Sequence, residues 1–117
     1  MSHFLIRRVA TGFKFDLEAA NGEVIATSEV YKSEAACRKG MQSVRKNAPS
    51  APLADLTVGE TSPNPRFELY EDRGGQFRFR LRSRNGAILA VSENYTAKSN
   101  CLDGIAAVRR YATEDKV

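Results

Sequence analysis

Hydrophobic and polar residues alternate along three consecutive segments in the second half of the chain, a pattern typical of β-strands with one buried face. The segments are residues 67–72, 76–84 and 87–92, and the last is apolar on both faces, as expected of a central strand. Asn85-Gly86 separates the second and third segments and indicates a two-residue hairpin turn, because both positions of that turn require a positive φ. The pattern therefore predicts a three-stranded meander.

A helical pattern follows this meander and also occurs in the first half of the chain. Its apolar residues recur three or four positions apart, which places them on one face of a helix. Ser33 is the expected N-cap of the first helix, whereas Ala97 stands at that position in the second, so Thr96 or Ser99 is expected to cap instead. A glycine in each apolar stripe predicts that the helix backbone approaches its neighbours closely. The two stripes are Cys37, Gly40, Met41, Val44 and Ala48, and Cys101, Gly104, Ile105, Val108 and Ala112.

The two halves of the chain are copies of one another. A shift of 64 positions aligns residues 13–48 with residues 77–112, and 14 of these 36 positions are identical. Each copy has about 55 residues, which is marginal for independent folding. We therefore expect the two copies to share one hydrophobic core.

A short fourth strand is expected after each helix, at residues 53–58 and, more weakly, at residues 113–117. Residues 59–66 contain two prolines and form the expected linker. We predict a single α+β domain over residues 1–117, with repeat 1 at 1–58 and repeat 2 at 67–117. Each repeat has the order β-β-β-α-β, and the two together form one antiparallel sheet with two helices on one face.

Composition and charge are those of an ordinary globular protein. The chain is 42% hydrophobic and 27% charged, and its net charge of +4 keeps nucleic acid among the candidate partners. It has no secretory signal pattern and no apolar run of the ~20 residues that a membrane span needs, so the expected location is the cytoplasm, without membrane contact. Cys37 and Cys101 are expected to be free, buried thiols. The single histidine, His3, is expected at the surface and argues against a zinc site, and no cofactor is expected.

A row of arginines on the second strand of repeat 2 is the main charged feature. Strand alternation places its side chains opposite the apolar residues, with Tyr70 of the neighbouring strand beside them. One interpretation is a nucleic-acid or polyanion track with Tyr70 as a stacking ring. We favour a solvated face on which Glu68 and Asp72 pair with the arginines across the hairpin. This arginine row consists of Arg78, Arg80, Arg82 and Arg84.

A Ser-Glu-x-Tyr motif leads into each helix and is a second candidate for a site. Its structural interpretation is a carboxylate near the positive end of the helix and a ring packed beneath it. The functional interpretation is a pair of pseudo-symmetric pockets between the repeats, formed by Glu29 and Tyr31 and by Glu93 and Tyr95.

Several motifs occur together in repeat 2: Phe67-Glu-Leu-Tyr, Phe77-Arg-Phe-Arg-Leu, Asn85-Gly86 and Ser92-Glu93-Asn94-Tyr95. Repeat 1 adds Ser28-Glu29-Val30-Tyr31-Lys32-Ser33 and, downstream, Gly40 and Ser43-Val44-Arg45-Lys46-Asn47-Ala48. In both copies, over nearly the whole chain, the sequence resembles the YegP-like family of small bacterial proteins. The resemblance implies β-β-β-α-β units, in tandem or as a dimer of single units, that build one sheet and exchange their last strands. It implies no activity and no catalytic residues, because the family is a domain of unknown function.

The sequence contains no recognisable catalytic constellation, so we predict a non-enzymatic function. The expected protein is a small monomeric interaction module that contacts an unknown protein partner through the open sheet face. On the third strands, Ile25 and Leu89 point opposite to Val24, Ala26, Ile88 and Ala90, so one of these two sets must leave the helix face. That set is expected to form an apolar strip on the open face if nothing covers it. The alternatives are nucleic-acid or polyanion binding through the arginine row, and an enzyme that uses Glu29 and Glu93 in a pocket between the repeats.

Overall fold

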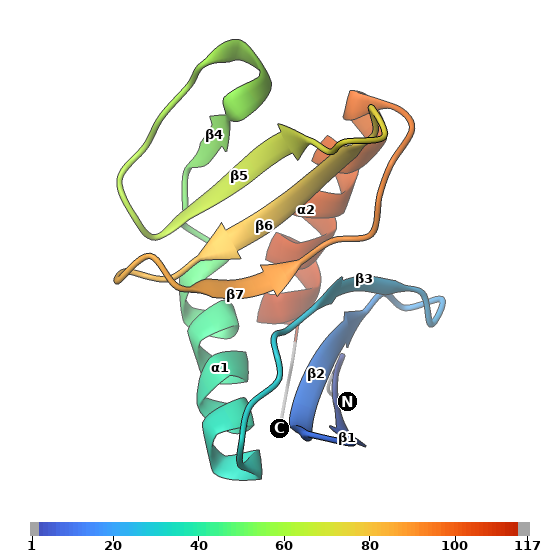
Figure 1. The fold of residues 1–117 in the computed structure, drawn as a ribbon, viewed down its shortest axis with the longest axis vertical. Helices are drawn as coiled ribbons and strands as arrows, with labels where there is room; N and C mark the ends of the chain where they lie inside the picture. The colour runs from blue at the N-terminus through green and yellow to red at the C-terminus, as the bar shows by residue number, and fades with distance from the viewer. Residues whose placement is uncertain (1–2, 115–117) are drawn as a thin grey trace.

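The computed structural model describes residues 3–114, and these residues form one seven-stranded sheet and two α-helices (Figure 1). Repeat 1 begins with three strands in an antiparallel meander and continues with a helix, a short strand and a 3-10 turn. Its elements are β1 (Phe4–Val9), β2 (Gly12–Glu18), β3 (Val24–Thr27), α1 (Glu34–Asn47), β4 (Leu53–Asp55) and η1 (Leu56–Val58).

Repeat 2 contains β5 (Arg66–Glu71), β6 (Phe77–Arg82), β7 (Ile88–Val91) and α2 (Lys98–Thr113). Three boundaries differ from the predicted ones. The strand β6 ends at Arg82 because the turn to β7 begins at residue 83. Residues 56–58 form η1, since the side chain of Asp55 accepts a hydrogen bond from the backbone of Thr57 and bends the chain there. Thr113 belongs to α2, so the strand predicted at 113–117 does not begin there, and residues 115–117 lie outside the described residues.

The strand order is β1-β2-β3-β7-β6-β5-β4, so the two meanders join through β3 and β7. This junction is antiparallel and places Thr27 opposite Val91. Repeat 1 contributes β4 to the edge of repeat 2, where Leu53 pairs with Phe67 of β5. The β4–β5 pairing is parallel and departs from the fully antiparallel sheet expected from the sequence, whereas the other pairings among the described strands are antiparallel.

Side chains of repeat 2 hold the end of repeat 1 in place. The ammonium group of Lys98 at the start of α2 donates hydrogen bonds to Asp55 Oδ2 (2.8 Å) and Thr57 Oγ1 (2.6 Å). Arg109 of α2 donates a hydrogen bond to the carbonyl oxygen of Ala48, 2.8 Å away. Both contacts bridge the repeats, so the exchanged strand is fixed by side chains as well as by its backbone pairing.

Apolar residues of both repeats meet in one hydrophobic cluster between the sheet and the helices. Figure 1 shows α2 behind β6 and β7, and α1 beside the strands. The helix α1 contacts β2 and β7, and α2 contacts β2, β3, β5 and β6, so each helix touches strands of both repeats. Phe15 and Phe79 occupy equivalent positions at the centre and are fully buried; each meets a second phenylalanine edge-on, Phe4 and Phe67 respectively.

The third strands do not form the apolar strip that strict alternation would place on the open face. Register shifts follow Leu17 in β2 and Leu81 in β6 and interrupt the alternation of β3 and β7. As a result Ile25 and Leu89 stay in the core, with only 8% and 6% of their surface exposed.

The glycines of the two helical stripes allow the close approach that the sequence predicts. A Cβ atom at Gly40 would lie 2.7 Å from Cζ of Tyr31 and 3.2 Å from Cε2 of Phe15. In repeat 2, a Cβ atom at Gly104 would lie 2.5 Å from the hydroxyl oxygen of Tyr95. Both glycines therefore make room for the tyrosine that precedes the helix in the chain.

The helices begin differently, and the difference gives a prediction about stability. Ser33 caps α1 and its hydroxyl accepts a hydrogen bond from Ala36 N (3.1 Å), whereas α2 begins at Ala97 without a side-chain cap, so neither Thr96 nor Ser99 takes that role. Ser33→Ala is expected to lower the free energy of unfolding by about 1 kcal/mol, and Ala97→Ser to raise it by a similar amount, because the Ala97 backbone is already extended as an N-cap requires. Urea denaturation of both variants measures these changes. Stabilisation by Ser33→Ala, or destabilisation by Ala97→Ser, would contradict the capping interpretation.

Candidate functional site

A single buried carboxylate organises the arginine row on the open face, the sheet surface opposite the helices. Glu68 of β5 is only 2% exposed and accepts hydrogen bonds from Arg80 (2.6 Å) and Arg82 (2.7 Å) of β6. Arg66, two residues before Glu68 on β5, approaches the other carboxylate oxygen at 2.6 Å. Three guanidinium groups thus surround one carboxylate.

Burial alone would raise the pKa of Glu68. The hydrogen bonds from Arg80, Arg82 and Arg66 outweigh burial and lower the pKa from its usual 4.5 to about 2. Glu68 is therefore ionised under physiological conditions and holds the three arginines together.

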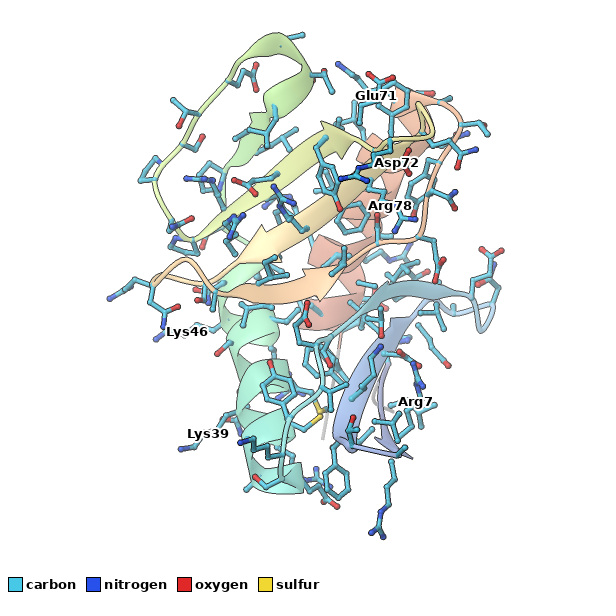
Figure 2. All side chains as sticks on the ribbon, viewed as in Figure 1. Arg7, Lys39, Lys46, Glu71, Asp72 and Arg78 are labelled. Atoms are coloured by element: carbon cyan, nitrogen blue, oxygen red, sulfur yellow. The ribbon has the colours of Figure 1, made fainter. Side chains whose placement is uncertain are left out.

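The remaining members of the row are also accounted for. Arg78 contacts Asp72 Oδ2 at 3.1 Å, and Figure 2 shows these two residues close together near the β5–β6 turn. The guanidinium group of Arg80 lies over the ring of Tyr70, 4.3 Å from its centroid. Arg84 lies outside β6, in the turn to β7, and is not on the same strand face. The arginine row is thus three paired arginines followed by a separate one.

Repeat 1 has a smaller polar network at the corresponding place, with the signs reversed as the sequence indicates. Arg7 of β1 donates to Asp16 of β2 at 2.9 Å, and the hydroxyl of Thr27 on β3 donates to the same carboxylate at 2.8 Å. Leu5 stands where repeat 2 has Glu68 and is half exposed. Neither half of the open face presents a uniform row of unpaired charge.

The Ser-Glu-x-Tyr motif begins with a structural serine. Ser28 is buried, and its hydroxyl accepts a hydrogen bond from Phe15 N (2.9 Å) and donates one to the carbonyl oxygen of Glu29 (2.7 Å). The tyrosine of the motif stacks on the same phenylalanine, with ring centroids 6.3 Å apart. Burial raises the pKa of Tyr31 above its usual value. Repeat 2 reproduces this geometry at its equivalent residues.

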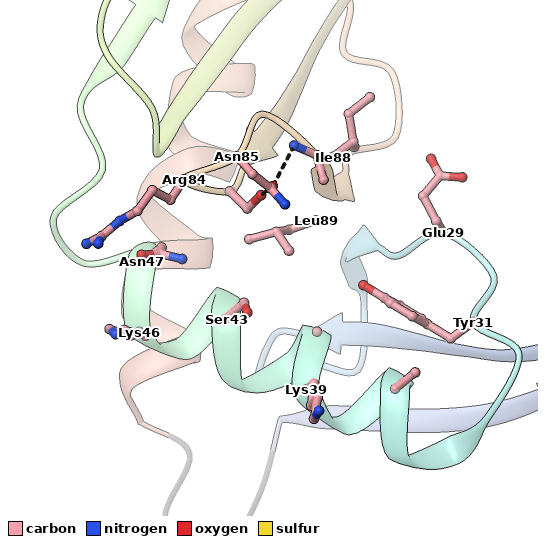
Figure 3. Close-up of a pocket in the computed structure, with 14 residues that line it drawn as sticks. Glu29, Tyr31, Lys39, Ser43, Lys46, Asn47, Arg84, Asn85, Ile88 and Leu89 are labelled. Atoms are coloured by element: carbon pink, nitrogen blue, oxygen red, sulfur yellow. Dashed lines mark hydrogen bonds between the residues drawn. The ribbon is translucent and has the colours of Figure 1, made fainter.

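A pocket of about 780 Å³ lies between the repeats and includes half of the predicted inter-repeat site. Glu29 and Tyr31 line it, but Glu93 and Tyr95 do not. Helix α1 forms one wall and the β6–β7 hairpin of repeat 2 forms the other (Figure 3). We call this site the inter-repeat pocket; it is lined by Glu29, Tyr31, Ala36, Lys39, Gly40, Ser43, Lys46, Asn47, Ser83, Arg84, Asn85, Ala87, Ile88 and Leu89.

The inter-repeat pocket has an apolar middle and polar ends. Figure 3 shows Arg84, Asn47 and Lys46 at one end, Glu29 and Tyr31 at the other, and Leu89 between them. Within residues 3–114, the charged side chains of this pocket take part in no hydrogen bond or ion pair. In Figure 2, Lys39 and Lys46 extend from α1 away from the sheet.

The nucleophilic and metal-binding candidates do not form a site. Both cysteines are buried, and burial raises the pKa of Cys101 to about 11 and that of Cys37 above its usual value, so both thiols stay protonated. His3 is less exposed than predicted, because its ring packs against Tyr111 (4.7 Å between centroids) and approaches Glu114. No group of three His, Cys, Asp or Glu side chains is placed to hold a metal ion in the part of the chain that the structure describes. None of the helices described is long and apolar enough to cross a membrane.

The sequence identified Arg84 as a candidate anion-binding residue, but not Lys39 and Lys46, the other two cations of the inter-repeat pocket. Lys39 and Lys46 lie seven positions apart on α1 and therefore share one helix face, away from the apolar stripe. This spacing is visible in the sequence, but it indicates a site only because the folded chain places the hairpin that carries Arg84 opposite that helix face.

The strand order and the two equivalent halves define a class of α+β proteins built from tandem units that share one sheet. The family model for a domain of unknown function (DUF1508) matches the chain over residues 9–55 and again over residues 72–117. The chain belongs to this family, which confirms the resemblance found in the sequence. The family is uncharacterised, and nothing in the comparisons indicates an enzymatic activity.

Individual relatives agree with this assignment. The chain is 33% identical to a UPF0339 protein of Pseudomonas aeruginosa over 95% of its own length and 90% of that protein, and 34% identical to the UPF0339 protein YegP of Escherichia coli K12 over 90% and 84%. The solution NMR structure of yegP from E. coli matches with a TM-score of 0.80 at 32% identity and covers 97% of this chain and 88% of that one. That of a UPF0339 protein from Shewanella oneidensis matches with a TM-score of 0.79 at 27% identity and covers 97% and 86%.

Proposed function

We propose that the protein is a non-enzymatic binding protein whose ligand is a small molecule held in the inter-repeat pocket. The observation that carries the proposal is the pocket itself, about 780 Å³ in volume, with an apolar floor and charged side chains that are unpaired within residues 3–114. Pockets that bind small molecules have volumes of about 300–1,000 Å³ and combine an apolar lining with a few polar groups.

The open face, where the sequence predicts contact with a protein partner, supports a binding function less well. Its charged side chains already pair with one another, as Arg80 does with Glu68 and Arg7 with Asp16. The ring of Tyr70 is covered by Arg80, so it is not a free stacking platform. Pairing of this kind also weakens the case for a nucleic-acid track, because a phosphate backbone would compete with carboxylates for the same arginines.

The chemistry of the pocket supports binding rather than catalysis. Its lining contains a serine hydroxyl, Ser43, but no histidine or cysteine. A serine nucleophile needs a base to remove its proton, and imidazole is the usual one. Lys39 and Lys46 of the pocket are exposed, whereas lysines that act as general bases are typically buried.

Equilibrium dialysis of the purified chain against a bacterial metabolite extract, followed by mass spectrometry, tests the proposal. Ser43→Trp places a large ring in the pocket, while Gln42→Trp adds the same ring to the exposed neighbouring position of α1 and serves as the control. We expect one or a few small molecules to be retained by the native chain and by Gln42→Trp, and to be lost from Ser43→Trp.

Retention of no molecule by the native chain, or equal retention by both tryptophan variants, would overturn the proposal. Circular dichroism and thermal unfolding of the two variants show that each is folded before dialysis, so that loss of ligand is not loss of structure.

A further inference from the structure

We infer that the ligand of the inter-repeat pocket carries one anionic group, a phosphate or a carboxylate, on an apolar body. The inference rests on the proposed function and names the ligand class for the same pocket. Three cationic side chains, Lys39, Lys46 and Arg84, line the pocket, against one carboxylate, Glu29. Cations that line one pocket attract an anion to it, and Arg in addition offers a planar pair of donors that fits phosphate or carboxylate.

These cations are distinguished from most other arginines of the chain by their lack of protein partners. Arg78, Arg80 and Arg82 each contact a carboxylate at 3.1 Å or less. Arg84, the next arginine along the chain, contacts none within residues 3–114. An arginine left unpaired beside a pocket is available to a ligand without first breaking an internal ion pair.

The turn that carries Arg84 is held by hydrogen bonds. Asn85 accepts hydrogen bonds from the hydroxyl of Ser83 and from the backbone of Ala87. Arg82 donates to the carbonyl oxygen of Gly86 at 2.8 Å. The backbone on either side of Arg84 is therefore ordered before a ligand arrives, which reduces the entropy lost on binding.

The middle of the pocket fits an apolar body. Leu89 is 6% exposed and, together with Ile88, Ala36 and Gly40, supplies carbon surface between the two polar ends. Glu29 lies at the end opposite Arg84 in Figure 3. A second negative group at that end would meet this carboxylate, so we expect a ligand with one anionic end rather than two.

The same backbone positions in repeat 2 are filled, which shows that the repeat architecture does not by itself produce an open cationic pocket. Tyr111 stands in place of Asn47 and Ala107 in place of Ser43, and both pack against the hydrophobic cluster. Asp103 replaces Lys39, and the cation equivalent to Lys46 is neutralised by Glu114 at 2.7 Å. Among the described residues, the helix face of repeat 1 borders a pocket with free cations and the equivalent face of repeat 2 is filled, so the expected stoichiometry is one ligand per chain.

The test compares four probes that share a benzene ring: phenyl phosphate, phenylacetate, benzyl alcohol and benzylamine. Their dissociation constants are measured by titration monitored in ¹H–¹⁵N NMR spectra at low salt. We expect both anions to shift the amide signals of Ser43, Arg84 and Leu89, and their affinity to fall as salt is added. Stronger binding of phenyl phosphate than of phenylacetate identifies a phosphate group as the preferred source of the charge, and the reverse identifies a carboxylate.

Charge variants locate the interaction. Arg84→Gln is expected to weaken phenyl phosphate binding about fivefold or more, whereas the control Arg73→Gln, which removes the same charge from the exposed β5–β6 turn, is expected to leave it unchanged. Glu29→Gln is expected to strengthen binding of both anions.

Two results would overturn the ligand class. One is binding of benzyl alcohol or benzylamine as strong as that of the anions, which would leave the proposed pocket in place with a different ligand. The other is an equal effect of Arg84→Gln and Arg73→Gln, which would show that the net charge of the chain, and not Arg84 itself, attracts the anion. Failure of the dialysis experiment with Ser43→Trp would instead remove the pocket itself as the site.

Discussion

Glu68→Gln is expected to lower the free energy of unfolding by about 3–5 kcal/mol, because removing one partner of a buried ion pair leaves uncompensated charge. Arg66, Arg80 and Arg82 all contact this carboxylate, and a neutral amide would leave three guanidinium groups close together without an anion. Guanidinium denaturation followed by circular dichroism measures the change. Glutamine keeps the size of the side chain, so the loss reports on charge rather than on a cavity.

Asp72→Asn is the matched control for this substitution. Asp72 meets a single arginine, Arg78, which is 36% exposed, so the loss should be much smaller than that of Glu68→Gln. Equal effects of the two substitutions would contradict the central role of Glu68 on the open face.

The pH dependence of stability gives a second measure of the same cluster. The pKa of Glu68 is lower in the folded chain, about 2, than its usual 4.5, so the unfolded chain binds a proton first as the pH falls. The contribution of Glu68, about 3 kcal/mol for a shift of this size, is therefore fully present above pH 4.5 and is lost between pH 4.5 and about 2. Between pH 6 and pH 2.5, the free energy of unfolding should decrease more steeply with falling pH for the native chain than for Glu68→Gln. Parallel decreases would contradict the lowered pKa of Glu68.

Gly104→Ala is expected to destabilise the protein by about 1–3 kcal/mol, although alanine favours helix over glycine by about 1 kcal/mol. The added methyl group would lie 2.5 Å from the hydroxyl oxygen of Tyr95 and 2.9 Å from Cε2 of Phe79. The phenylalanine ring is fully buried and has no room to move aside. Thermal unfolding measures the loss.

Two comparisons separate a steric effect from a general effect of glycine. Gly74→Ala lies in a turn where the nearest atom to the new methyl group is 3.4 Å away, so its effect should be small. In a Tyr95→Phe background, Gly104→Ala should cost less than in the native chain, because the closest oxygen is gone. Stabilisation by Gly104→Ala would show that α2 does not approach the sheet as described.

Local patterns predicted most of the fold because the same elements occur twice along the chain, once in each repeat. The alternation of Phe77, Phe79 and Leu81 and the Ser33 cap correspond to what the structure shows. The Asn-Gly turns form at the predicted places, but in them only Gly22 and Gly86 have a positive φ, so they are not the two-residue turns that require it at both positions. The departures arise from contacts that no local pattern contains. The turn that begins at residue 83 ended β6 earlier than predicted, and the hydrogen bonds of Asp55 turned the end of the predicted fourth strand into η1.

The candidate site was harder to predict than the fold, and the reason is the divergence of the two copies. The sequence indicated cross-strand pairing of Glu68 with an arginine, but only the register of β5 and β6 brings Arg66 and Arg82 to the same carboxylate. It also suggested two equivalent inter-repeat pockets. Over residues 3–114, the helix of repeat 1 lines a pocket with free cations and the equivalent positions of repeat 2 do not, since Tyr111 is a core side chain where repeat 1 has the pocket residue Asn47.

The placement of β4 beside β5 bears on how the chain folds as it is synthesised. Residues 53–55 emerge from the ribosome before residues 66–71, with which they pair. The first repeat therefore emerges with a strand whose backbone has no pairing partner until the first strand of the second repeat has followed. The time that residues 56–71 take to emerge then decides how long that strand remains unpaired and exposed to neighbouring nascent chains. Such exposure is a hazard for any protein in which a strand emerges before the strand that it pairs with.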